Sequence, residues 1–160
     1  MTVRKQFLGF LGWLVVAFAA AAVGAVASVR AGEFYQSLDR PAWAPPAAVF
    51  GPVWTFLYLC MAVASWLVWR EPTLRRRPAL VIYVTQLALN AVWSWLFFAW
   101  HQGLWACVEI VVLWVLIGAT VVRFWPIRRA AAALLIPYWL WVSFATLLAF
   151  AVWRRNPALW

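Results

Sequence analysis

The sequence predicts an all-α membrane protein, a bundle of five transmembrane helices with a folded first loop. Hydrophobic residues make up 68% of the 160 residues, whereas soluble domains contain about 45–50%. They are grouped into five long runs, each close to the roughly 20 residues that a membrane-spanning helix needs. We therefore expect one domain over residues 1–160, without a separate soluble domain.

The five apolar runs define the predicted helices. They cover about residues 7–29, 49–69, 79–100, 104–122 and 130–153. The first run could instead be a signal peptide, since it follows basic residues and contains the A-x-A sequence of Ala25–Ala27, but it is longer than a usual signal-peptide core. Its Ala20, Gly24 and Ser28 recur every four residues and form a small-residue face that lets another helix approach closely.

The net charge of +9 comes from basic residues placed at the ends of the apolar runs. They are Arg4, Lys5, Arg70, Arg75, Arg76, Arg77, Arg123, Arg128 and Arg129 on alternate connections, with Arg154 and Arg155 after the last run. Such alternation predicts a multi-pass protein with its N-terminus inside. It also favours contact with membrane lipid over binding to nucleic acid.

Residues 30–48 form a first loop that is long for a small bundle, and long loops are usually functional or disordered. Large apolar groups and three prolines favour an ordered loop. We expect this loop to lie as a lid across the outer end of the bundle. The residues predicted to form the lid are Arg30, Tyr35, Arg40, Pro41, Trp43, Pro45 and Pro46.

Polar and aromatic residues recur in the outer halves of the other four predicted helices. A rise of about 1.5 Å per residue places them at similar depths. They are Trp54, Tyr58, Asn90, Trp93, Trp105, Glu109, Tyr138, Trp141, Ala145 and Leu148. We expect them to line a ligand cavity beneath the lid, although Asn90 and Gln86 could simply join helices by hydrogen bonds. The two cysteines and the single histidine have no metal-site spacing, so no metal is expected.

Four stretches carry a family resemblance. They are FYQSLDRPAWAPP with VFGPVWTFLYLCMAVASWLVW, TQLALNAVWSWLFF with its Gln-x3-Asn-x2-Trp spacing, GLWACVEI, and PYWLWVSFATLL. Over residues 34–156 the sequence resembles the TspO/MBR family of tryptophan-rich sensory and translocator proteins. The resemblance implies a five-helix homodimer that binds porphyrins such as protoporphyrin IX. The cavity residues that it implies are Trp54, Asn90, Trp105, Trp141, Ala145 and Leu148.

The resemblance implies three alternative functions. The first is a receptor for porphyrins and other hydrophobic ligands that regulates tetrapyrrole metabolism or a stress response, with porphyrin as ligand and no cofactor required. The second is light-dependent porphyrin degradation through Trp54 or Trp141, since the sequence has no conventional catalytic set. The third is transport of a tetrapyrrole or lipid. Phe150 replaces the tyrosine of the cholesterol motif of animal members, so a sterol is not the expected ligand.

The predicted location is a bacterial cell membrane, either inner or outer. The small-residue face of the first helix is one candidate for the dimer interface.

Overall fold

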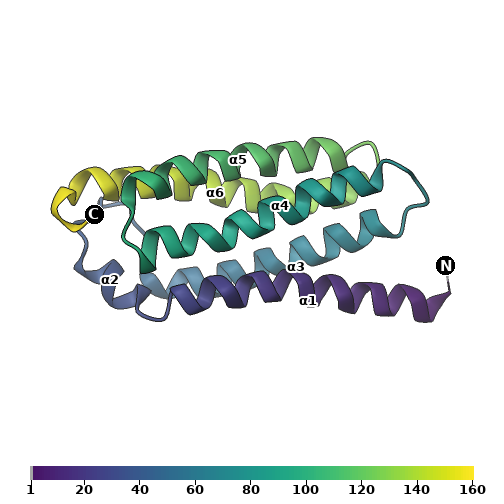
Figure 1. Ribbon diagram of the computed structural model, residues 1–160, viewed down its shortest axis with the longest axis horizontal. Helices are drawn as coiled ribbons and strands as arrows, with labels where there is room; N and C mark the ends of the chain where they lie inside the picture. The colour runs from purple at the N-terminus through teal and green to yellow at the C-terminus, as the bar shows by residue number, and fades with distance from the viewer. Residues whose placement is uncertain (1) are drawn as a thin grey trace.

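The computed structural model describes residues 2–160 as a bundle of long helices. Five helices are long and apolar enough to cross a membrane: α1 (Val3–Ala27), α3 (Phe50–Trp69), α4 (Arg76–Ser94), α5 (Gly103–Phe124) and α6 (Arg129–Arg155). They run up and down along one axis, so the two termini lie at opposite ends (Figure 1). The predicted all-α bundle of five membrane helices is confirmed. We call the two ends of the bundle the N-terminal end and the α2 end, after the short helix α2 (Ala31–Ser37).

The observed helix bounds lie within a few residues of the predicted ones, and the largest difference is at the end of α4, where the α-helix stops at Ser94. α1 begins at Val3 because Thr2 caps it, with Thr2 Oγ1 accepting a hydrogen bond from the Lys5 N–H at 3.4 Å. α4 ends in a π-helical turn, η2 (Trp95–Ala99). α6 contains Pro137 in its interior. An apolar run marks the part of a helix that lies in lipid, so the polar turns at its ends are missed.

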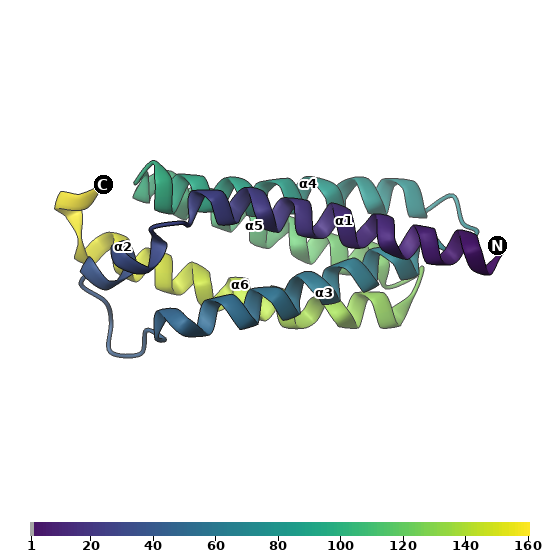
Figure 2. The same cartoon turned by 90° about the horizontal axis from the view of Figure 1, so that it is seen from below.

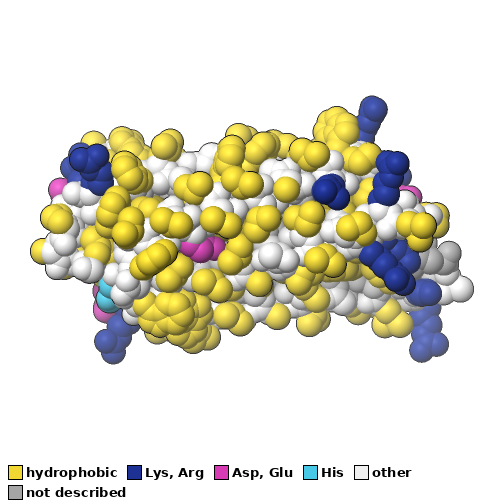
Figure 3. Space-filling model, turned by 45° about the horizontal axis from the view of Figure 1, so that its top comes forward, with side chains coloured by type: hydrophobic (Ala, Val, Ile, Leu, Met, Phe, Trp, Pro, Cys, Tyr) yellow, Lys and Arg dark blue, Asp and Glu magenta, His cyan; other side chains and the backbone are white. Residues whose placement is uncertain are grey.

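The five long helices form a closed ring. α1 packs on α3, α3 on α6, α6 on α5, α5 on α4, and α4 again on α1. The same arrangement is seen from below in Figure 2. The interior contains the large, fully buried side chains of Tyr83, Met61 and Tyr138. The outer wall is largely hydrophobic, with Lys and Arg gathered towards the two ends (Figure 3), as expected for a protein surrounded by lipid.

The first loop is folded and contains a helix that the sequence did not predict. α2 is followed by an extended segment and by a 3₁₀ turn, η1 (Ala47–Val49), which leads into α3. The Phe34 ring packs on Phe97 at 6.3 Å and on Trp160 at 5.7 Å between ring centroids. Because α2 buries Tyr35 and the following Leu38, the loop is attached to the bundle rather than free in solvent.

The small-residue face of α1 packs inside its own chain. Gly24 is buried against α4, where an added Cβ would lie 3.2 Å from Ser94 Oγ. The Ser28 hydroxyl donates to the Gly24 carbonyl at 2.8 Å. Gly24 therefore serves the close approach of α1 and α4, and it is not available for the dimer interface that the sequence suggested.

A second close approach of helices supplies a test of this packing. An added Cβ at Gly9 would overlap the indole ring of Trp69 in α3, whereas a Cβ at Gly12 would meet no atom within 4 Å. Gly9→Ala should lower the free energy of unfolding in detergent by about 1–3 kcal/mol, the usual cost of overpacking. Gly12→Ala should leave it unchanged or raise it slightly, because Ala favours helix. Thermal unfolding followed by circular dichroism measures both, and equal melting temperatures would contradict the packing of Trp69 on Gly9.

Candidate ligand-binding site

A chain of four polar side chains crosses the centre of the bundle. The Tyr58 hydroxyl donates to Asn90 Oδ1 at 2.7 Å, and Asn90 Nδ2 donates to the Tyr138 hydroxyl oxygen at 3.0 Å. The Tyr138 hydroxyl in turn donates to Gln86 Oε1 at 2.8 Å. All four residues are buried. Since the surroundings are apolar, these bonds tie α3, α4 and α6 together at one depth.

Three tryptophans lie one helical turn closer to the α2 end than this polar chain. Trp54 precedes Tyr58 by four residues in α3, while Trp93 and Trp141 each follow a polar-chain residue by three in α4 and α6. α3 runs opposite to α4 and α6. On each helix the tryptophan therefore lies about 5–6 Å along the axis from the polar residue, in the direction of the α2 end. The Trp54 ring packs on Tyr58 at 5.8 Å and on Tyr138 at 6.2 Å. We call Trp54, Trp93 and Trp141 the tryptophan layer.

Several polar groups in this half of the bundle have no hydrogen-bond partner in the described part of the chain. They are the buried indole N–H groups of Trp93, Trp141 and Trp160 and both carboxyl oxygens of Glu109 in α5. Figure 3 shows an acidic side chain in the middle of the otherwise apolar wall. A buried polar group without a partner costs about 1–3 kcal/mol, and proteins contain few of them. These groups therefore keep unused hydrogen-bonding capacity within the described residues.

Edge-to-face and tilted contacts between aromatic rings connect the tryptophan layer with the first loop. Phe50 packs on Trp141 at 5.8 Å, and Tyr35 packs on Phe50 at 5.4 Å. Trp43 packs on Phe144 at 5.8 Å, and Phe144 packs on Trp141 at 5.5 Å. Two residues of the first loop therefore cover Trp141, each through one intervening ring.

Hydrogen bonds and an Arg–aromatic contact order the first loop. The Tyr35 hydroxyl donates to the Pro45 carbonyl at 2.9 Å. The Arg40 guanidinium lies 4.7 Å from the centre of the Tyr35 ring. Burial raises the pKa of Tyr35 above its ordinary value, and the Arg40 cation opposes this rise, so the hydroxyl keeps its proton at neutral pH. Pro41 is buried, whereas Arg30 and Pro46 are exposed.

Asn156, which sequence reasoning missed, joins the first loop to the end of α6. Its Oδ1 accepts a hydrogen bond from the Asp39 N–H at 2.9 Å, and its Nδ2 donates to the Asp39 carbonyl at 3.0 Å. Nδ2 also donates to the Val152 carbonyl at 2.8 Å. Arg155 adds an exposed ion pair to Asp39 at 3.5 Å. An Asn after a helix is a recognisable cap, but its pairing with a backbone far away in sequence depends on the fold. We call the Asn156–Asp39 pairing the loop clamp.

The structure brings most of the predicted cavity residues together, with one clear exception. Buried or partly buried residues of the two core clusters include Trp54, Tyr58, Trp93, Tyr138, Trp141, Ala145 and Leu148, and Asn90 is buried as a polar residue. Trp105 instead is 60% exposed on the outside of α5, so its placement in the cavity is wrong. The helical rise gives the position of a residue along the helix axis, but it does not give the direction in which its side chain points around that axis. Glu109, one turn further along α5, is half-buried.

The described residues offer no place for a metal ion. Within residues 2–160, no group of three or more His, Cys, Asp or Glu side chains is arranged to hold one. The groups that the candidate site presents are aromatic faces, indole N–H donors and one carboxyl group.

Comparison with known proteins gives one family. The profile of the TspO/MBR family matches residues 12–154. The human translocator protein is 40% identical over 127 residues, which cover 78% of this chain and 75% of that protein. The tryptophan-rich protein TspO of Chlorobaculum tepidum is 38% identical over 128 residues, 78% of this chain and 80% of that protein. The tryptophan-rich sensory protein of Cereibacter sphaeroides is 34% identical over 147 residues, 92% and 90% of the two chains.

The polar chain can be tested with two tyrosines that differ in hydrogen bonding. Tyr138→Phe removes a hydroxyl that accepts a hydrogen bond from Asn90 and donates one to Gln86. Each of the two side-chain amides then loses one hydrogen bond. The free energy of unfolding should fall by about 1–3 kcal/mol. Tyr83→Phe removes a buried hydroxyl that has no partner within the described residues, so stability should stay the same or rise. Thermal unfolding in detergent distinguishes the variants, and similar losses for both would exclude the polar chain as a special stabilising feature.

The loop clamp can be tested by hydrogen exchange. Asn156→Ala removes both bonds to Asp39, so backbone amides of residues 31–46 should exchange several-fold faster, while those of α4 and α5 stay protected. Arg155→Gln removes only an exposed ion pair, which contributes about 0–1 kcal/mol, and should change exchange little. Exchange that is unaltered in Asn156→Ala would show that aromatic packing alone holds the loop.

Proposed function

The chain belongs to the TspO/MBR family, and from this we propose that it is an integral membrane receptor that binds a porphyrin in the α2-end half of the bundle. The name of the Cereibacter sphaeroides relative, a tryptophan-rich sensory protein, supports a sensing role. The ligand would report the state of tetrapyrrole metabolism.

The tryptophan layer is the observation that carries this proposal. A porphyrin is a flat, mostly apolar ring with carboxylates at its edge. Indole faces stack well on flat rings, and the free N–H groups of Trp93 and Trp141 are donors that suit a carboxylate or a ring nitrogen. In the polar chain below this layer, hydrogen bonds join Tyr58, Asn90 and Tyr138 to Gln86 Oε1, and only Gln86 Nε2 has no partner within the described residues. We take this chain as the floor of the site.

The first loop acts as the lid in this proposal. Aromatic rings fill the space between the tryptophan layer and the loop, so a ligand as large as a porphyrin enters only when Tyr35 and Trp43 move away from Phe50 and Phe144. Arg40, which lies over the Tyr35 ring, moves with the loop. It can then pair with a ligand carboxylate, since guanidinium and carboxylate groups form strong charge-assisted hydrogen bonds.

The proposed orientation has the N-terminal end inside. The N-terminus and the connections between α3 and α4 and between α5 and α6 lie at this end (Figure 1). These segments carry most of the basic residues, including Lys5, Arg75 and Arg128. An excess of Lys and Arg marks the cytoplasmic side of a membrane protein. The lid would then face the outer side, from which the ligand is sampled.

Porphyrin binding should depend on Trp141. Titration of the detergent-purified protein with protoporphyrin IX in the dark, followed by the porphyrin absorbance, separates binding from photochemical loss. Trp141→Ala should weaken binding by at least about tenfold, because it removes a stacking face that corresponds to more than about 1.4 kcal/mol. Trp141→Phe keeps a ring without the N–H and should show an intermediate loss.

Trp125→Ala is the matched control for this titration. Trp125 is 51% exposed at the N-terminal end, far from the tryptophan layer, so its replacement should leave porphyrin affinity unchanged. Equal affinities of the Trp141→Ala and wild-type proteins would refute this site. Equal losses in the Trp141→Ala and Trp125→Ala variants would indicate unspecific adsorption of porphyrin to the apolar surface.

A further inference from the structure

Two hollows lie side by side at the N-terminal end, away from the proposed porphyrin site. One, of about 420 Å³, is lined by Lys5, Gln6, Trp69, Arg70, Glu71, Pro72 and Arg76. The other, of about 430 Å³, is lined by Val3, Gln6, Phe7, Phe10, Val63 and Trp66. Gln6 belongs to both, so a polar hollow and an apolar hollow meet at one residue between α1 and α3.

The polar hollow is set up to attract an anion. Lys5, Arg70 and Arg76 contribute cations, and within residues 2–160 neither Lys5 nor Arg70 forms an ion pair. Glu71 is the acidic residue of the lining, and it is paired with Arg128 at 3.6 Å. The Arg76 guanidinium donates to the carbonyls of Trp69 and Glu71 at 3.0 and 3.1 Å, which holds the connection between α3 and α4 in place beside the hollow.

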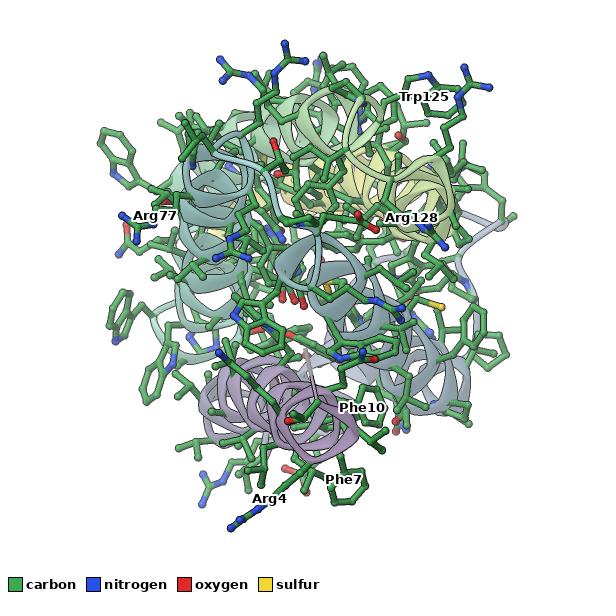
Figure 4. All side chains as sticks on the ribbon, turned by 90° about the vertical axis from the view of Figure 1, so that its right-hand side faces the viewer. Arg4, Phe7, Phe10, Arg77, Trp125 and Arg128 are labelled. Carbon is green, nitrogen blue, oxygen red and sulfur yellow. The ribbon has the colours of Figure 1, made fainter. Side chains whose placement is uncertain are left out.

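Side-chain contacts join the two hollows. The Arg70 guanidinium, which lines the polar hollow, lies 4.9 Å from the centre of the Trp66 ring, which lines the apolar one. The Trp66 indole N–H donates to the Gln6 carbonyl at 3.1 Å, and Phe10 meets Trp66 edge-on at 5.5 Å. Figure 4, which views this end, shows Phe10 on the side of α1 that faces α3.

The order of the two hollows along the membrane normal matches that of a phospholipid. The polar lining comes from the chain end and from the connection after α3, whereas the apolar lining reaches back along α3 to Val63. The seven residues from Val63 to Arg70 rise by about 10 Å, the scale over which a bilayer changes from acyl chains to headgroups. Phe7, which is 61% exposed, adds an apolar surface where an acyl chain would lie.

We propose that this double hollow binds an anionic phospholipid, with the headgroup phosphate among Lys5, Arg70 and Arg76 and the first part of an acyl chain against Phe7, Val63 and Trp66. Charge complementarity selects an anionic over a zwitterionic headgroup. The continuous apolar hollow selects a lipid over a free anion. The site is independent of porphyrin binding, because it lies at the opposite end of the bundle.

Native mass spectrometry of the full chain tests the proposal. The protein is released from detergent micelles containing either phosphatidylglycerol or phosphatidylcholine. The wild-type protein should retain phosphatidylglycerol and little phosphatidylcholine. Lys5→Gln and Arg70→Gln should each lower the retained phosphatidylglycerol about fivefold, the effect of removing one cation from an anionic lipid surface. Lys5→Gln changes an exposed residue of the first helical turn, so loss of folding does not confuse the result.

Two matched controls come from the same segments. Arg75→Gln removes the same charge from the same connection, but Arg75 does not line the hollow, so retention should stay at the wild-type level. Phe7→Ala should lower retention, whereas Leu8→Ala, which is 56% exposed on the same helix outside the apolar hollow, should not. Equal losses in Arg75→Gln and Arg70→Gln would overturn the site in favour of general attraction to a basic surface.

A competition experiment with soluble anions distinguishes a bound lipid from a bound free anion. Inorganic phosphate or glycerol phosphate at millimolar concentration should not displace phosphatidylglycerol, since neither fills the apolar hollow. Displacement by either anion, or equal retention of phosphatidylcholine, would overturn the proposal.

Discussion

The hydrogen-bonded chain from Tyr58 through Asn90 and Tyr138 to Gln86 is the constraint on which the rest of the bundle depends. In a lipid environment, hydrophobicity does not decide which face of a helix turns inward, because lipid tails are as apolar as leucine. Polar groups do decide it, since an unpaired amide or hydroxyl is costly there. Each bond contributes only about 0.6–2 kcal/mol, but together they fix how α3, α4 and α6 are rotated.

This rotation places the tryptophan layer. Trp54, Trp93 and Trp141 lie one turn from the polar chain on the same helix faces, so orienting the tyrosines and the asparagine also directs the indoles inward. The layer then provides the surface on which Phe50 and the first loop pack. The sequence thus builds the candidate site by placing a tryptophan one helical turn from a polar residue on each of three helices, and no residue in that layer has a positive φ.

The sequence predicted the features that depend on position along a helix and missed those that depend on rotation or on distant pairing. Five spans, and the common depth of Tyr58, Asn90 and Tyr138, follow from run length and helical rise. Trp105 matched the depth but lies outside, because neither rule gives the angle around α5. The Asn156–Asp39 pairing joins residues far apart in sequence, and only the assembled fold brings them together.

The centre of the bundle and its α2 end are held by bonds of different kinds, which explains how the proposed receptor would open without unfolding. At the centre, four buried side chains bond to one another across three helices, and water has no access to replace those bonds. At the α2 end, the loop clamp and a few ring contacts hold the first loop. The clamp's two hydrogen bonds contribute about 0.5–1.5 kcal/mol each, and water can take their place when the loop lifts. The least costly opening would therefore expose the tryptophan layer and leave the polar chain closed, so that in the proposed receptor ligand entry and fold stability would be controlled by different residues.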